Sequence, residues 1–158
     1  MDATGGREKP LYEATLAVER IKAAGQAIDA EQSGVLLTGR CEAFLWGVTD
    51  LKLVIERLQA YSTAGADCLY APGLKTREDI AEVVKAVAPK PVNLLIGASG
   101  LSLQQAEQLG VRRISVGGSL ARNAWAGFMK AAKEMAEQGT FTDLANGYPG
   151  GELNKMFR

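Results

Sequence analysis

Short apolar runs alternate along the chain with longer segments in which apolar residues recur every three or four positions. A short apolar run bounded by turn residues is typical of a buried strand, and the three-to-four spacing is typical of a helix with one apolar face. Strands are therefore expected over 35–38, 67–70, 92–96 and 113–116. Helices are expected over 11–28, 50–64, 77–87, 103–109 and 120–138, with a last short one over 152–157.

Polar side chains at the starts of four predicted helices are expected to cap their first turns. The expected caps are Thr49, Thr76, Ser102 and Ser119, and Gln105 completes a capping box with Ser102. The 158 residues fit a single domain. Its expected parts are a loop over 1–10, an α-βα-βα-βα-βα core over 11–138 and a C-terminal tail over 139–158.

Each predicted strand is nearly all apolar and is followed by an amphipathic helix, as in parallel sheets with helices on at least one face. Two architectures share this pattern: an open doubly wound sheet and part of a (β/α)8 barrel. A complete barrel needs eight strands and about 200 residues or more. Because only four strands are predicted, the pattern alone favours an open α/β sheet.

Composition excludes several classes of function. Lys plus Arg and Asp plus Glu both total 18, so charge gives no reason to expect binding to nucleic acid or an anionic membrane. The chain has no histidine, which removes the commonest general base and most zinc sites. It has no run long enough to span a bilayer and no signal-peptide core. Cys41 and Cys68 adjoin apolar runs and are expected as buried free thiols, so the predicted location is the cytoplasm.

Candidate chemistry gathers at the carboxyl ends of the predicted strands, where α/β proteins hold their ligands. Arg40 and Glu42 directly follow the first apolar run and could either clamp an anionic substrate or order a loop as an ion pair. Gly117 and Gly118 precede a helix, where backbone N–H groups suit an anion, although a tight turn with an ordinary helix cap is the favoured interpretation. Asn93 interrupts an apolar strand, so its amide either faces a barrel interior or is satisfied within the core.

Several motifs in combination resemble the isocitrate lyase/phosphoenolpyruvate mutase superfamily, most closely its carboxyvinyl-carboxyphosphonate phosphorylmutase-like branch. The stretches that carry the resemblance are 11–12, 17–21, 37–44 (LTGRCEAF), 60–61, 64–73, 90–93 (KPVN) and 110–118 (GVRRISVGG). The family fold is a (β/α)8 barrel, and the resemblance begins just after its fourth strand. It therefore implies the second half of that barrel, strands five to eight, with dimerisation as one way to complete it.

The resemblance also implies a type of chemistry. Members of the superfamily use Mg²⁺ to stabilise an enolate of a 2-oxo-acid or phosphonate substrate while a C–C or P–C bond breaks or forms. The resemblance makes Arg40 the residue that contacts the substrate's carboxylate or phosphonate, and Glu42 the acid beside it. It also places Ser99 near the loop that closes on substrate in the lyases. Asn93, Gly117 and Gly118 complete the candidate substrate-binding residues.

The family's magnesium ligands lie mostly in the half of the barrel that this chain does not resemble. The Glu-Asp pair after the fourth strand matches Met1 and Asp2, and Pro72 stands where some lyases have a glutamate, which argues against cleavage of isocitrate or methylisocitrate. As a truncated barrel, the chain is expected to be inactive alone. The alternative is a non-catalytic half barrel that forms a homo-oligomer, with contacts from its apolar tail: Leu153, Met156 and Phe157.

Overall fold

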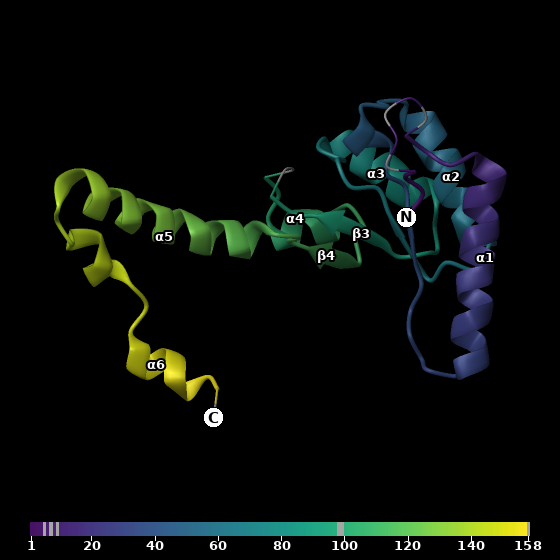
Figure 1. Cartoon of the computed structure of the whole chain (residues 1–158). Coiled ribbons are helices and arrows are strands. Elements are labelled where there is room, and N and C mark those ends of the chain that lie inside the picture. The colour runs from purple at the N-terminus through teal and green to yellow at the C-terminus, as the bar shows by residue number, and fades with distance from the viewer. Residues whose placement is uncertain (5, 7, 9, 98–99, 158) are drawn as a thin grey trace. The chain divides into compact units, whose positions relative to one another are not determined.

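The computed structural model describes residues 1–4, 6, 8, 10–97 and 100–157. The chain divides into two compact units, Met1–Val116 and Gly117–Arg158. The first unit is a parallel sheet with associated helices (Figure 1). Its elements are α1 (Ala14–Glu31), β1 (Thr38–Arg40), the 3-10 helix η1 (Ala43–Trp46), α2 (Leu51–Thr63), β2 (Cys68–Tyr70), α3 (Arg77–Ala86), β3 (Val92–Leu95), α4 (Leu103–Gln108) and β4 (Arg113–Ser115).

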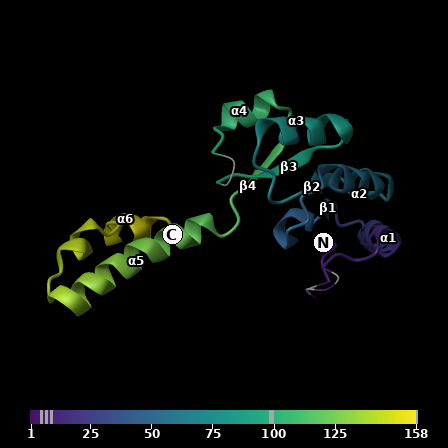
Figure 2. The same cartoon turned by 90° about the horizontal axis from the view of Figure 1, so that it is seen from above.

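The four strands pair in the order β1-β2-β3-β4, and every pair is parallel. Because crossovers between parallel strands are right-handed, strands added in one direction place their connecting helices on one face of the sheet. Figure 2 shows α2, α3 and α4 on one side of the strands. A doubly wound sheet reverses its strand order, and the described strands contain no such reversal. The observed order is that of a barrel arc, so the open doubly wound sheet favoured by the pattern alone is not formed.

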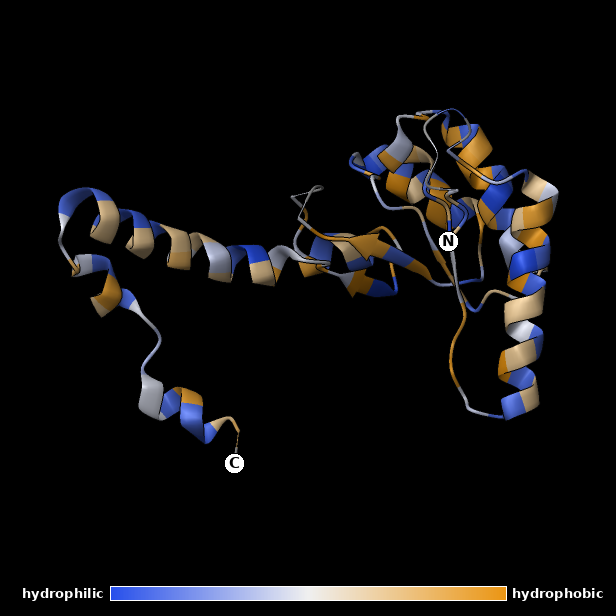
Figure 3. Cartoon of the chain, viewed as in Figure 1, coloured by the Kyte–Doolittle hydropathy of each residue, from blue (hydrophilic) through white to orange (hydrophobic). Residues whose placement is uncertain are grey.

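The hydrophobic core lies between the sheet and these helices, and its apolar positions are orange in Figure 3. Gly39 on β1 is required there because a Cβ atom at this position would lie 2.9 Å from the Cβ of Tyr61 on α2. β1 therefore packs directly against α2. The larger fully buried apolar side chains of the core are Val54, Leu58, Leu69, Ile80, Val83, Val92 and Leu94.

Three helices of the first unit begin with a side-chain cap. The capping residues are Asp50 on α2, Thr76 on α3, and Ser102 with Gln105 as a capping box on α4. The caps of α3 and α4 were predicted. The cap of α2 was expected at Thr49 but is Asp50, whose Oδ1 accepts a hydrogen bond from the N–H of Leu53 at 3.2 Å.

The N-terminal hairpin, residues 2–4 and 10–12, ties the start of the chain to the entrance of α1. Ala3 and Leu11 form an antiparallel β-bridge, and the N–H of Tyr12 donates to the carbonyl of Asp2 at 2.8 Å. The Asp2 side chain is directed inward, and the residue is only 2% exposed. The predicted N-terminal loop is therefore anchored to the first unit by its second residue.

The second unit contains α5 (Ser119–Gln138), the 3-10 helix η2 (Thr142–Asn146) and α6 (Gly150–Lys155). α5 ends at the predicted residue, but its start differs from the prediction. Ser119 was expected as the cap and is instead the first helical residue, with Gly118 at the capping position and no side-chain cap bond. The Ser119 hydroxyl accepts a hydrogen bond from Arg122 Nη2 at 2.9 Å instead.

Glu134 fastens the turn between α5 and η2. Its Oε1 accepts hydrogen bonds from the Thr140 hydroxyl at 2.6 Å and the Thr142 N–H at 2.8 Å, and its Oε2 accepts from the Asp143 N–H at 2.7 Å. The bond from Thr140, followed by those from the backbone, stabilises the ionised carboxylate and lowers the pKa of Glu134 to about 2.

Glu134 is expected to make the stability of this turn depend on pH. Since its folded-state pKa is below the ordinary value of 4.5, its stabilisation is complete above that pH and is lost as the pH falls toward about 2. In urea titrations at a series of acidic pH values, Glu134→Gln should flatten the acid dependence of helix unfolding. The control Glu137→Gln, which removes only an exposed contact to Lys133 at 3.9 Å, should retain the wild-type profile. An unchanged profile in Glu134→Gln would contradict the assignment.

Every predicted strand and helix has an observed counterpart, although several ends shift. α1, expected over 11–28, is observed three residues later at both ends, over Ala14–Glu31. β1, expected over 35–38, is observed over Thr38–Arg40, because Val35 and Leu36 are exposed and lead into the strand rather than forming it. η1 and η2 are too short to produce a helical pattern and were not predicted. The organisation as one domain over 1–158 stays a prediction. Among the helices in the described parts of the chain, none is long and apolar enough to cross a membrane.

Candidate functional site

Arg40 and Glu42 form an ion pair at the carboxyl end of β1. Arg40 Nε lies 2.5 Å from Glu42 Oε1. Apart from this ion pair, neither atom has a polar partner among the residues described. The guanidinium carbon lies 5.0 Å from the centre of the Tyr70 ring, close enough for a cation–π contact. The Glu42 side chain is 5% exposed, whereas that of Arg40 is 36% exposed. A buried carboxylate is thus paired with Nε of an arginine whose side chain is partly exposed.

Arg40 belongs to a row of side chains on the sheet face opposite the helices. Gly39 faces α2, and side chains alternate along a strand, so Arg40 points to the other face. The strand register continues the row across the whole sheet, through Arg40, Tyr70, Asn93 and Arg113. This face therefore presents an arginine on each outer strand with polar groups between them.

Asn93 is fixed within this row by two hydrogen bonds. Its Nδ2 donates to the Ser115 hydroxyl at 2.9 Å, and its Oδ1 accepts from Arg113 Nη1 at 3.3 Å. The residue is 1% exposed, so both ends of a buried amide have a partner. The amide is therefore satisfied by protein partners, as one prediction had it, and lies on the sheet face opposite the helix-covered core.

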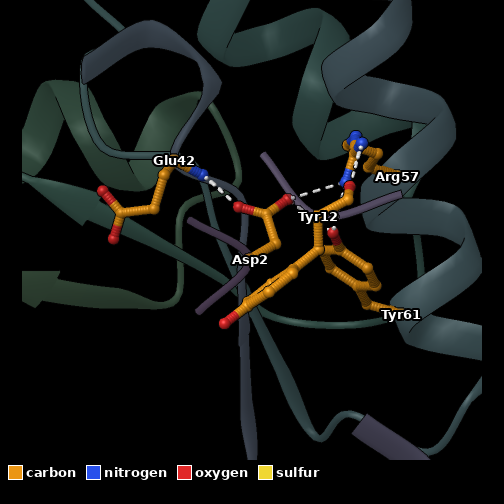
Figure 4. Close-up of polar contacts among 5 residues, drawn as sticks. All are labelled: Asp2, Tyr12, Glu42, Arg57 and Tyr61. Atoms are coloured by element: carbon orange, nitrogen blue, oxygen red, sulfur yellow. Dashed lines mark hydrogen bonds and ion pairs between the residues drawn. The ribbon is translucent and has the colours of Figure 1, made fainter. Parts of the chain in front are cut away.

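Asp2 holds the loop that follows β1. Its Oδ1 accepts a hydrogen bond from the Glu42 N–H at 2.8 Å. Its Oδ2 accepts from the Tyr61 hydroxyl at 2.5 Å and from Arg57 Nη1 at 3.2 Å (Figure 4). Arg57 Nη2 in turn donates to the carbonyl of Tyr12 at 2.7 Å. One buried carboxylate therefore links the N-terminal hairpin, α2 and the Arg40–Glu42 loop.

Burial keeps the two acidic groups beside Asp2 protonated. It raises the pKa of the Cys41 thiol to about 12, and the negative charge of Asp2 acts in the same direction. Burial, and then the hydrogen bond to Asp2, also raises the pKa of Tyr61 well above its ordinary value. Neither group is suited to act as a nucleophile or base near neutral pH. Cys41 and Cys68 are buried free thiols, as predicted.

The remaining predicted site residues are Gly117, Gly118 and Ser99. Gly117 and Gly118 belong to the second unit, where Gly117 has a φ of 52° and the Gly118 carbonyl accepts from the Arg122 N–H at 2.9 Å. Ser99 lies outside the described residues. The first unit thus brings Arg40 and Glu42 into contact and places Asn93 on the same sheet face.

Sequence reasoning missed two residues of this region and the contacts of a third, Asp2. Tyr70 and Arg113 could have been found by aligning the predicted strands, because both alternate onto the face of Arg40. Asp2 is distant in sequence from Glu42 and Tyr61, and no periodic pattern relates them. A tertiary contact between a loop and a chain start leaves no local signal.

The carboxylates near Arg40 do not fit a magnesium site. Within the described ranges, no group of three or more His, Cys, Asp or Glu side chains is arranged to hold a metal ion. Glu42 is paired with Arg40, and both oxygens of Asp2 accept hydrogen bonds from protein donors. Mg²⁺ prefers several free oxygen ligands, which this region does not offer.

The fold and the sequence as a whole match known proteins. The family model for phosphoenolpyruvate phosphomutase matches residues 2–136. A lyase/mutase from Burkholderia cenocepacia J2315, so named provisionally, is 47% identical with a TM-score of 0.94, over 99% of this chain and 56% of its own. A phosphonomutase from the same organism, also provisionally named, is 30% identical with a TM-score of 0.73, over 88% of this chain and 56% of its own. No curated protein matches.

A third solved structure belongs to 2,3-dimethylmalate lyase, described as a PEP mutase/isocitrate lyase superfamily member. It is 26% identical with a TM-score of 0.78, over 89% of this chain and 50% of its own. The chain therefore spans about half the length of the solved structures it matches. The chain belongs to the phosphoenolpyruvate phosphomutase family, within the PEP mutase/isocitrate lyase superfamily.

Proposed function

We propose that this chain supplies the anion-binding side of a (β/α)8 active site that acts on 2-oxo-acid or phosphonate substrates. In this proposal Arg40 binds the carboxylate or phosphonate of the substrate and Glu42 orients it. The reaction would break or form a C–C or P–C bond through an enolate. Asn93, Ser99, Gly117 and Gly118 are proposed as further substrate-binding residues.

The observation that carries the proposal is Arg40, whose side chain is partly exposed and whose Nε is paired with a buried carboxylate at the carboxyl end of a parallel strand. Such strand ends hold the ligands of (β/α)8 enzymes, and an arginine whose terminal nitrogens have no hydrogen bond among the described residues suits a planar carboxylate. The solved relative named as a phosphonomutase supports the phosphonate class, and a solved oxaloacetate acetylhydrolase, 26% identical with a TM-score of 0.75, supports the 2-oxo-acid class.

Completion of the barrel is part of the proposal. Four parallel strands in sequential order would need four more to close, from another chain or from a longer parent. The family's Mg²⁺ would be held by residues of that other half, since the carboxylates near Arg40 are already engaged. We therefore expect the 158-residue chain to bind a small dianion without catalysing a reaction.

Oxalate is the probe for this expectation, because it is a small planar dianion with two carboxylates. Titration into the ¹⁵N-labelled chain should shift the Arg40 Nε–H signal with a dissociation constant of about 1 mM, which corresponds to a total binding free energy of about 4 kcal/mol. Arg40→Met should weaken binding by about tenfold or more, equal to about 1.4 kcal/mol. Assays with Mg²⁺ and oxaloacetate or phosphonopyruvate should show no turnover by the chain alone.

Arg20→Met is the matched control, because Arg20 is also an arginine but lies over the Tyr12 ring, 4.8 Å from its centre, outside this sheet face. It should bind oxalate as the wild type does. Equal oxalate affinity in Arg40→Met and wild type would refute the clamp. Turnover by the chain that Arg40→Ala abolishes would show that the missing half is not required.

A second candidate function is a non-catalytic module that self-associates as a homo-oligomer. It is favoured by the apolar side chains that the second unit exposes: Leu120, Trp125, Phe128, Met129, Leu153, Met156 and Phe157. Sedimentation of the oxalate samples separates the two candidates. Association without oxalate binding supports the module, and oxalate binding that depends on Arg40 supports the active-site proposal. In either case, the buried free thiols support a cytoplasmic location.

A further inference from the structure

The position of Glu42 depends on a bond from outside its own strand. The last sheet bond at the end of β1 runs from the Cys41 N–H to the Tyr70 carbonyl at 2.9 Å. The next N–H, that of Glu42, has left the sheet and donates to Asp2 Oδ1 at 2.8 Å. Asp2 therefore anchors the backbone at the residue that supplies the carboxylate of the ion pair.

The Asp2 carboxylate is itself held rigidly. Its second oxygen accepts from the Tyr61 hydroxyl and from Arg57, both on α2, and its backbone carbonyl accepts from Tyr12 in the hairpin. Asp2 is 2% exposed, so water does not compete for these bonds. A buried carboxylate with two oxygens and fixed donors on each side has one stable orientation (Figure 4).

We propose that Asp2 is a positioning residue for the Arg40–Glu42 clamp, an inference that rests on the proposed function. The bond from the Glu42 N–H fixes the backbone of Glu42, the backbone directs its side chain, and Oε1 holds Nε of Arg40. The Tyr70 ring supports the guanidinium within cation–π distance. Loss of the carboxylate at position 2 would release the guanidinium without altering any residue that touches the anion.

Two substitutions of Asp2 test this, because the more drastic one risks the fold. Asp2→Ala removes both acceptor oxygens. Asp2→Asn keeps the size but has one oxygen, and Arg57, a charged donor, is expected to take it and leave the Glu42 N–H facing an NH₂ group. Tyr61→Phe is the matched control, since it removes a bond to the same carboxylate but leaves the Glu42 bond intact.

The main readout is the Arg40 Nε–H signal in ¹⁵N NMR of the 158-residue chain, which needs no ligand. Asp2→Asn should shift or broaden it, and Tyr61→Phe should leave it unchanged. The second readout is oxalate affinity in variants whose urea midpoints have been measured. Asp2→Asn should weaken oxalate binding by about tenfold. Tyr61→Phe should weaken it by less than about twofold, even where its urea midpoint falls as far as that of Asp2→Asn.

The outcomes test the positioning role of Asp2 and the proposed function separately. An unchanged Arg40 signal in folded Asp2→Asn overturns the positioning role, as does an equal loss of affinity in Tyr61→Phe. If the wild type binds no oxalate, the proposed function fails, and the Arg40 signal still decides whether Asp2 positions the ion pair. If Asp2→Ala does not fold, Asp2→Asn carries the test alone.

Discussion

Replacing Arg57 with methionine is expected to lower the free energy of unfolding by about 4 kcal/mol. Arg57 Nη1 pairs with Asp2 Oδ2 at 3.2 Å, and the two side chains are only 12% and 3% exposed. Removing the arginine leaves the buried Asp2 carboxylate without its cation. An uncompensated buried charge destabilises the folded state by more than the loss of an exposed ion pair would. The Tyr12 carbonyl also loses its donor from Arg57 Nη2.

The measurement is a urea titration followed by circular dichroism, read as a change in midpoint at constant slope. Arg20→Met is again the control, because it removes an arginine from α1 whose guanidinium only covers the Tyr12 ring at the surface. It should cost less than about 1 kcal/mol. A loss below about 1 kcal/mol in Arg57→Met would mean that Asp2 does not need its cation.

Replacing Gly73 with alanine is expected to cost about 3 kcal/mol of stability. Gly73 has a φ of 105°, which side-chain-bearing residues rarely adopt, and a Cβ there would lie 2.6 Å from the Cβ of Phe44 in η1. Backbone strain and a steric clash therefore act together. The clash would push η1 away from the loop after β2, close to the Arg40–Glu42 pair.

Gly65 separates the two causes. Its φ of 104° is nearly the same, but a Cβ there would meet nothing within 4 Å. Gly65→Ala should therefore cost about 1 kcal/mol from strain alone. The difference between the two variants in chemical denaturation measures the contact with Phe44. Equal losses in both variants would show that η1 moves aside at no cost.

Much of the fold could be predicted because local patterns carry it. The apolar stripe of α3, with Ile80 and Val83 fully buried, and the capping box of α4 are encoded within a few residues. The pattern of strands and helices does not encode strand order, so a barrel arc and a doubly wound sheet looked alike. Resemblance to the superfamily resolved this ambiguity, and the family match confirms the resemblance.

The candidate site was predictable only in part. Arg40 and Glu42 stand out because they follow an apolar run, and the structure places them in contact. The anchor of the pair, Asp2, has no helical or strand pattern around it. Its partners Glu42, Arg57 and Tyr61 come from separate elements, so only the folded chain brings them together.

The order of the strands also bears on how the first unit folds. Each strand pairs with the one that precedes it in sequence, so each pairing closes only one crossover and the sheet is rich in contacts of modest sequence separation. The bonds of Asp2 to Arg57 and Tyr61 differ, because they span 55 and 59 residues. Such a contact is expected to form late, after the folding transition state, so its strength governs mainly the rate of unfolding. Arg40 and Glu42 would then reach their final positions last. Substitutions of Asp2 would speed unfolding and leave the folding rate nearly unchanged.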